Sequence, residues 1–167
     1  MKFFLSIFLI NIIFFNISLA SNIVYLDLDY ILNNSNSGKK IIYKLNEANK
    51  RNLELLKEEE KKLNLEKNEI DKTRNIISEA ELTEKIKILN SKFQNFTKKQ
   101  EVLSNEFKNL RNKEINNLLE KINPIIEKYM LDNNIDMVLK KENFYISKSE
   151  FDVSKRLILL IDKNINN

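Results

Sequence analysis

Between residues 39 and 77 the chain has neither glycine nor proline, and apolar residues recur there at seven-residue spacing. A seven-residue apolar repeat is typical of one seam of a coiled coil. The companion positions of the seam are mostly polar, so this helix is predicted to be largely solvated and to need a partner. The repeat comprises Ile42, Leu56, Leu63, Ile70 and Ile77, with Asn49 as its polar exception.

A second apolar seam follows, and it is stronger. The string Ser78-Glu79-Ala80-Glu81 has the form of a capping box, which predicts that a helix begins near Ser78. The seam alternates steps of four and three residues through Leu82, Ile86, Leu89, Phe93, Phe96, Gln100, Leu103, Phe107 and Leu110, with only Gln100 polar. Two such helices joined by a tip near residues 72–79 must run antiparallel, which predicts a coiled-coil arm over residues 39–131. At 1.5 Å per residue its length is about 60 Å. Pro124 is expected to kink or restart the returning helix.

The flanking segments, residues 21–38 and 132–167, predict a small β-rich body. Residues 22–28 indicate a buried strand, residues 135–139 and 144–147 a hairpin, and residues 155–163 a final amphipathic helix. The fold class is therefore mainly α with a small β body. A body this small buries little core, so we expect its strands to pair between chains. The residues predicted to form these oligomerisation strands are Ile23, Val24, Tyr25, Leu26, Met137, Val138, Leu139, Tyr145 and Ile146.

The first twenty residues have the layout of a secretory signal peptide. Lys2 precedes a mostly apolar run that ends in Ser18-Leu19-Ala20, with small residues where a signal peptidase cleaves. We expect cleavage after Ala20, so that residues 1–20 are removed. The alternative is an uncleaved membrane anchor, because the run is close to the minimum length of a spanning helix.

Composition narrows the function classes. The chain has no Cys and no His, so neither disulfides, the usual transition-metal ligands nor the usual general base are available. Without Lys2 it carries 27 basic and 24 acidic residues, a net charge of +3, which is too mild to indicate nucleic acid. Asp27 and Asp29 lack a catalytic partner and are expected to be solvated or to cap a helix. We therefore predict no enzyme activity, catalytic residue, cofactor or metal.

Charge is segregated onto the arm. Residues 39–131 carry 21 basic and 16 acidic residues, a net charge of +5, whereas the body carries 6 and 8, a net charge of −2. The candidate binding residues of the arm are Phe93, Phe96, Phe107, Lys85, Lys92 and Lys99. The alternative for the aromatic residues is packing within the hairpin seam. The alternative for the lysines, which recur every seven residues, is solvation or pairing with glutamates of the first helix.

Three strings resemble the Skp/OmpH family of periplasmic chaperones. They are IVYLDLDYIL at residues 23–32 followed by SNSGKK at 35–40, NIDMVL at 134–139, and FDVS at 151–154. Their order around a charged helical hairpin carries the resemblance, which covers the whole mature chain. Pro124 and the scarcity of Ala and Gln in the arm depart from the family pattern.

The resemblance implies a homotrimer whose strands form a central barrel and whose arms enclose a cavity. It implies an ATP-independent periplasmic holdase that binds unfolded outer-membrane β-barrel proteins and prevents their aggregation. The basic arm also suggests weak contact with an anionic membrane surface or lipopolysaccharide. The alternative function is a periplasmic coiled-coil scaffold or adaptor that binds a folded partner.

Overall fold

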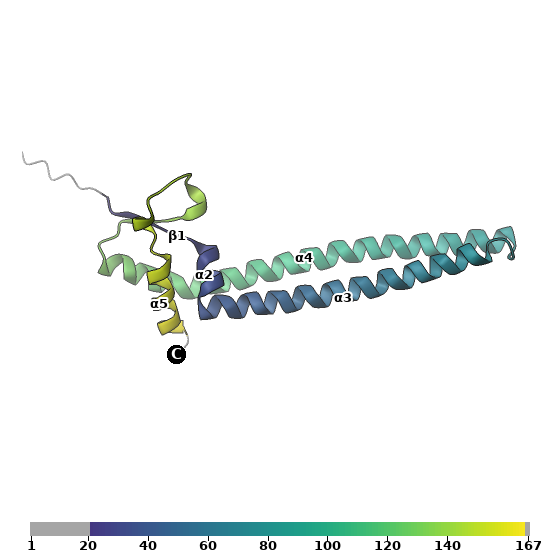
Figure 1. Ribbon diagram of the computed structural model, residues 1–167, viewed down its shortest axis with the longest axis horizontal. Coiled ribbons are helices and arrows are strands. Elements are labelled where there is room, and N and C mark those ends of the chain that lie inside the picture. The colour runs from purple at the N-terminus through teal and green to yellow at the C-terminus, as the bar shows by residue number, and fades with distance from the viewer. Residues whose placement is uncertain (1–20, 166–167) are drawn as a thin grey trace, which may run out of the picture.

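The computed structural model describes residues 21–165 and has two parts, a small body and a long helical arm (Figure 1). Two long helices lie side by side to form the arm, and the strands and shorter helices gather at its base. The predicted signal peptide, residues 1–20, lies outside the described residues. Within residues 21–165, no helix combines the length and the apolar character that crossing a membrane requires. The helical hairpin that the two seams predict is thus the dominant feature.

The body contains a sheet of two strands, β1 (Ile23–Leu26) and β2 (Met137–Lys140), which pair in parallel. The register places Tyr25 opposite Leu139. Parallel strands need a long crossover connection, and here the entire arm is that crossover. The sheet therefore fixes both ends of the arm in one small unit.

The strand predicted over residues 144–147 is absent from the described chain, and the expectation of a hairpin there is wrong. The 3₁₀ helix η2 (Lys141–Asn143) follows β2 directly, and the rest of the segment has no regular structure. The connection contains no glycine and does not make the tight turn that hairpins favour. The second edge of β1 instead meets Asp152, and there the Val153 amide donates to the Tyr25 carbonyl over 3.0 Å.

Only Ser35 separates α2 (Leu28–Asn34) from α3 (Asn36–Thr73). Its hydroxyl caps α3 by accepting from the Gly38 amide over 3.0 Å. The predicted start of this helix is Lys39, but α3 begins three residues earlier and Gly38 belongs to its first turn. A Cβ atom at Gly38 would lie 2.3 Å from the carbonyl oxygen of Leu32. Gly38 is needed because the backbones of α2 and α3 approach closely there.

The tip of the arm is a short turn between α3 and α4 (Glu79–Asp132). α3 ends at Thr73, four residues before the predicted end, and the Thr73 hydroxyl donates to the Glu69 carbonyl over 2.9 Å. The Ser78 hydroxyl accepts from the Glu81 amide over 3.3 Å, which confirms the predicted cap.

α4 passes through Pro124 without interruption, so of the two predicted outcomes, a kink or a restart, the restart does not occur. Proline cannot donate to the carbonyl four residues earlier, which belongs to Glu120. Both residues are exposed, and water can satisfy that carbonyl.

The body core forms where α5 (Ser154–Ile165) crosses the base of the arm (Figure 1). The Asp152 carboxylate accepts from the Ser154 amide over 2.9 Å and so satisfies the first free amide of α5. Ile122 of α4 and Leu157 of α5 are both 0% exposed. The core therefore includes side chains from the range 39–131 that the sequence assigns to the arm. Its buried residues are Val24, Leu26, Ile31, Leu32, Leu118, Ile122, Tyr129, Ile135, Val153, Leu157 and Ile161.

Candidate functional site

The aromatic residues predicted to bind a partner lie on the seam between α3 and α4. Phe96 is buried in a cluster with Leu63, Ile70 and Leu89. Phe93 is half-buried against the same cluster, and Phe107 is half-buried farther toward the body. Phe93 and Phe96 thus help to hold the hairpin together, which is the alternative that the sequence left open. Phe93 and Phe107 keep part of their surface accessible.

The three lysines of the seven-residue series all form ion pairs. Lys92 Nζ lies 2.5 Å and 2.7 Å from the two carboxylate oxygens of Glu66 on α3. Lys99 Nζ pairs with one carboxylate oxygen of Glu59, which also belongs to α3. Lys85 instead pairs with Glu81, one turn earlier on its own helix, over 3.0 Å. Two of the three lysines thus tie the returning helix to the outgoing one, and all remain partly exposed.

The arm also exposes apolar side chains that the sequence analysis missed. Tyr43, Leu65 and Ile76 of the outgoing segment are 68%, 56% and 82% exposed. Tyr43 and Leu65 both belong to α3 and are 22 residues apart, slightly more than six turns, so they lie on one side of the helix, opposite the seam. Ile76 lies in the turn at the tip of the arm. A search for apolar residues outside the heptad register would have found them. The other exposed apolar residues of the arm are Leu53, Leu55, Ile86, Ile88 and Val102.

The predicted oligomerisation residues divide into two groups. Val24, Tyr25 and Leu26 are buried within the protomer, whereas Val138 and Leu139 are half-buried. Tyr25 also stacks edge-on against Phe144, with ring centroids 4.8 Å apart. The exposed group comprises Ile23, Met137, Tyr145 and Ile146, at 40%, 48%, 102% and 82%. The exposed side chains lie on or next to the small sheet.

The paired carboxylates of the β1–α2 junction have structural roles. Asp27 caps α2 by accepting from the Tyr30 amide over 2.9 Å, and its second oxygen lies 2.7 Å from Lys141 Nζ. The hydrogen bonds from Lys141 and Tyr30 lower the pKa of the Asp27 carboxyl. Asp29 is exposed in the first turn of the same helix. Among residues 21–165, no group of three or more acidic side chains is arranged to hold a metal ion.

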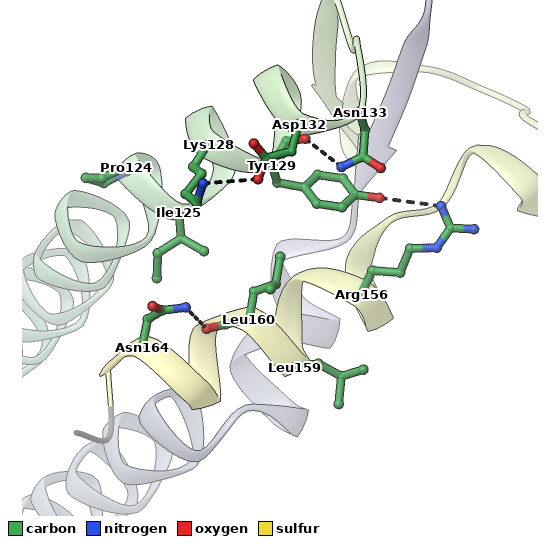
Figure 2. A pocket seen from close by; sticks show the side chains of 10 residues that line it. All are labelled: Pro124, Ile125, Lys128, Tyr129, Asp132, Asn133, Arg156, Leu159, Leu160 and Asn164. Carbon is green, nitrogen blue, oxygen red and sulfur yellow. Dashed lines mark hydrogen bonds and ion pairs between the residues drawn. The ribbon is translucent and has the colours of Figure 1, made fainter.

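A groove of about 530 Å³ lies between the last turns of α4 and the length of α5 (Figure 2). Ile125, Leu159 and Leu160 line its apolar walls, and Arg156 stands at one end. Arg156 Nη1 donates to the Tyr129 hydroxyl over 3.4 Å, and this bond raises the pKa of the guanidinium. No heptad or motif marks this groove, because its two walls come from segments that are distant in sequence.

A family model described as "Outer membrane protein (OmpH-like)" matches residues 22–160, which is most of the chain. The chain belongs to the OmpH-like family. Among solved structures, it is similar to a putative outer membrane chaperone (OmpH-like) from Caulobacter crescentus, with a TM-score of 0.73 and 16% sequence identity. That similarity covers 88% of this chain and 87% of the other. A search of curated proteins found no match.

Membership in the OmpH-like family confirms the resemblance that the three short strings carry. The solved relative is similar in fold to this chain, whose own structure consists mostly of long helices. The match extends from the start of β1 into α5 and therefore spans both the body and the arm.

Proposed function

We propose that this OmpH-like protein is an ATP-independent holdase chaperone of the periplasm, secreted by means of a cleaved signal peptide. Its clients are unfolded outer-membrane β-barrel proteins, which it binds between the arms of a homotrimer and keeps from aggregating. The family match over residues 22–160 carries this proposal.

The surface of the arm supports the proposal. Its exposed apolar residues are distributed along both helices: at 1.5 Å per residue, Tyr43 and Leu65 lie about 33 Å apart, with Leu53 and Leu55 between them. A stable interface with one folded partner requires a continuous, well-packed patch. Dispersed apolar contacts with a net positive charge suit weak binding of many sequences instead. The surface therefore favours a holdase over an adaptor for a folded protein.

The seam residues have a secondary role in this proposal. The accessible surfaces of Phe93 and Phe107 add apolar contacts for a client, while Phe96 holds the hairpin closed. Lys85, Lys92 and Lys99 attract acidic segments of a client toward the arm. To bind such a segment, each lysine must leave its glutamate, and the exposed ion pair that is broken is weak. The same stripe provides weak contact with an anionic membrane surface or lipopolysaccharide.

The body supports association of three chains. The exposed group Ile23, Met137, Tyr145 and Ile146 lies beside a sheet of only two strands. A small sheet with unpaired backbone at its edge is a template for pairing with another chain. Segment 144–147, which forms no strand in the protomer, can complete that sheet in a neighbour. A native mass near 53 kDa tests the trimer, since three mature chains of 147 residues at 19.9 kDa per 167 residues reach that value.

Holdase activity is tested by diluting a urea-unfolded outer-membrane protein into buffer and following light scattering. The mature chain should suppress aggregation equally with and without ATP. Replacing Tyr43, Leu65 and Ile76 by serine should weaken the suppression, because the client then loses these exposed apolar contacts. The matched control replaces the exposed Asn46, Asn68 and Asn75 of the same segment by serine and should leave it unchanged. Aggregation at the rate of the client alone would refute the proposal, and capture of one folded protein would favour the adaptor.

A further inference from the structure

The groove between α4 and α5 combines apolar walls with a cation that has no carboxylate partner among residues 21–165. Arg156 donates to the Tyr129 hydroxyl, and no carboxylate of the described residues lies within ion-pair distance of it. The other charges of the lining neutralise each other, because Lys128 and Asp132 pair over 3.2 Å. A guanidinium beside apolar surface without an acid is complementary to a carboxylate attached to an apolar group.

The position of Arg156 adds to this complementarity. It is the third residue of α5, a helix of twelve residues whose first turn carries a partial positive charge. Tyr129 is buried and therefore holds the guanidinium at a defined place. Figure 2 shows Arg156 and Asn133 at one end of the groove, and Pro124 and Asn164 toward the other.

The dimensions of the groove indicate a short occupant. From Pro124 to Asn133 the α4 wall rises nine residues, or about 14 Å. About four residues of extended chain span that distance. The cation stands at the end of this span, so an apolar stretch that fills the groove would place its last atoms against the guanidinium.

We infer that this groove binds the carboxy-terminal end of an unfolded polypeptide, with its last apolar side chains in the groove and its α-carboxylate on Arg156. The groove lies at the base of the arm, apart from the arm surface that carries the proposed holdase activity. It would give that activity a preference for chain ends, and to this extent the inference rests on the proposed function. Capture of a terminal carboxylate is a known mode of peptide recognition.

The test is fluorescence anisotropy with a labelled Gly/Ser decapeptide that ends in Leu-Val-Leu-Leu, as the free acid and as the amide. The mature protein should bind the free acid about tenfold more tightly than the amide, as expected for a charge-assisted hydrogen bond. Arg156→Gln should abolish that difference. Arg51→Gln, the same change at an exposed position of α3, should preserve it.

A second variant examines the apolar half of the site without disturbing the core. Leu159 is 73% exposed, so Leu159→Ser should fold normally and weaken binding of the acid and the amide alike. Equal affinity for the two peptides, or equal losses in Arg156→Gln and Arg51→Gln, would overturn the proposal. So would the absence of binding, which is the result expected if a second copy of the chain covers the groove. Suppression of client aggregation without peptide discrimination would overturn this inference alone, whereas discrimination without suppression would overturn the holdase alone.

Discussion

The body and the arm bury their apolar residues to different degrees. The core residues of the body range from 0% to 9% exposure, and Ile31, Ile122, Leu157 and Ile161 are at 0%. In the arm, the four buried residues of the seam retain 6% to 8% exposure and are flanked by polar positions. The body packs α2, α4 and α5 around one core, whereas the arm has a single contact line between two helices. The body therefore fixes the position of the arm, and the arm is expected to open locally at a lower free-energy cost.

The largest expected loss of stability comes from a core substitution, and one such substitution in each region tests whether the body is more tightly packed than the arm. Leu157→Ala leaves a cavity in the closed body core and should lower the free energy of unfolding by about 3–4 kcal/mol. Leu63→Ala removes the same atoms from the arm seam, where two helices can close the gap, and should cost about 2 kcal/mol or less. Urea unfolding followed by circular dichroism, at one protein concentration, measures both.

Hydrogen exchange separates the two variants further. Leu63→Ala should accelerate exchange in the arm alone, whereas Leu157→Ala should accelerate it throughout the body. Equal losses of stability and uniform hydrogen exchange in both variants would contradict the expectation that the arm opens locally more easily than the body.

Gly38→Ala tests the joint between the two regions. Within a helix, replacing glycine by alanine ordinarily adds about 0.5–1 kcal/mol of stability. Here the new Cβ would lie 2.3 Å from the Leu32 carbonyl oxygen, so α2 and α3 must separate. We expect a loss of about 2 kcal/mol instead, of the size that overpacking causes. Ser91→Ala, at an exposed position of α4, is the control, and a stabilised Gly38→Ala variant would show that the joint can relax.

The sequence predicts features that depend on neighbouring residues and misses those that depend on distant ones. The heptad positions Leu63 and Ile70 are buried, and Ser78 caps α4, because helix periodicity and capping act over a few residues. The parallel pairing of β1 with β2 joins segments on opposite sides of the arm, which no local pattern encodes. Residues 144–147 have strand-forming side chains but lack a partner strand within the protomer. Propensity alone therefore overestimates the sheet.

The candidate sites follow the same rule. The seam pattern identifies Phe96, Lys92 and Lys99, and the structure places these three where the two helices of the hairpin meet. Lys85 follows the same pattern but pairs within its own helix. Tyr43, Leu65 and Ile76 lie outside the seam, so the heptad pattern did not identify them. The α4–α5 groove was missed because Tyr129 and Arg156 meet only when the last helix folds back across the arm.

Acid should affect the body through the Asp27–Lys141 pair. The folded state lowers the pKa of Asp27, so this group adds stability above its unfolded pKa near 3.8 and loses it as the pH falls through the lower folded value. Asp27→Asn retains a capping side chain but removes the charge, so its stability should vary less below about pH 4 than that of the wild type. Stability measured against pH, with Asp29→Asn as the control, tests this. Identical slopes for the wild type and Asp27→Asn would exclude a contribution from the pair.

The smallest effect concerns the ion pairs of the arm. Lys92 and Lys99 each join α4 to a glutamate of α3, but all four side chains are at least one-third exposed. Exposed pairs contribute about 0.2–1 kcal/mol and weaken with salt. Lys92→Gln should therefore lower the free energy of unfolding by less than about 1 kcal/mol at low salt, and the difference should vanish at high salt. Lys87 is an exposed lysine of α4 that pairs with no residue of α3 among residues 21–165. Lys87→Gln should therefore change little at any salt concentration if cross-helix pairing is the cause. A loss that persists at high salt would mean that the Lys92 side chain stabilises the seam by packing, and the arm would then be less dependent on charge than its structure indicates.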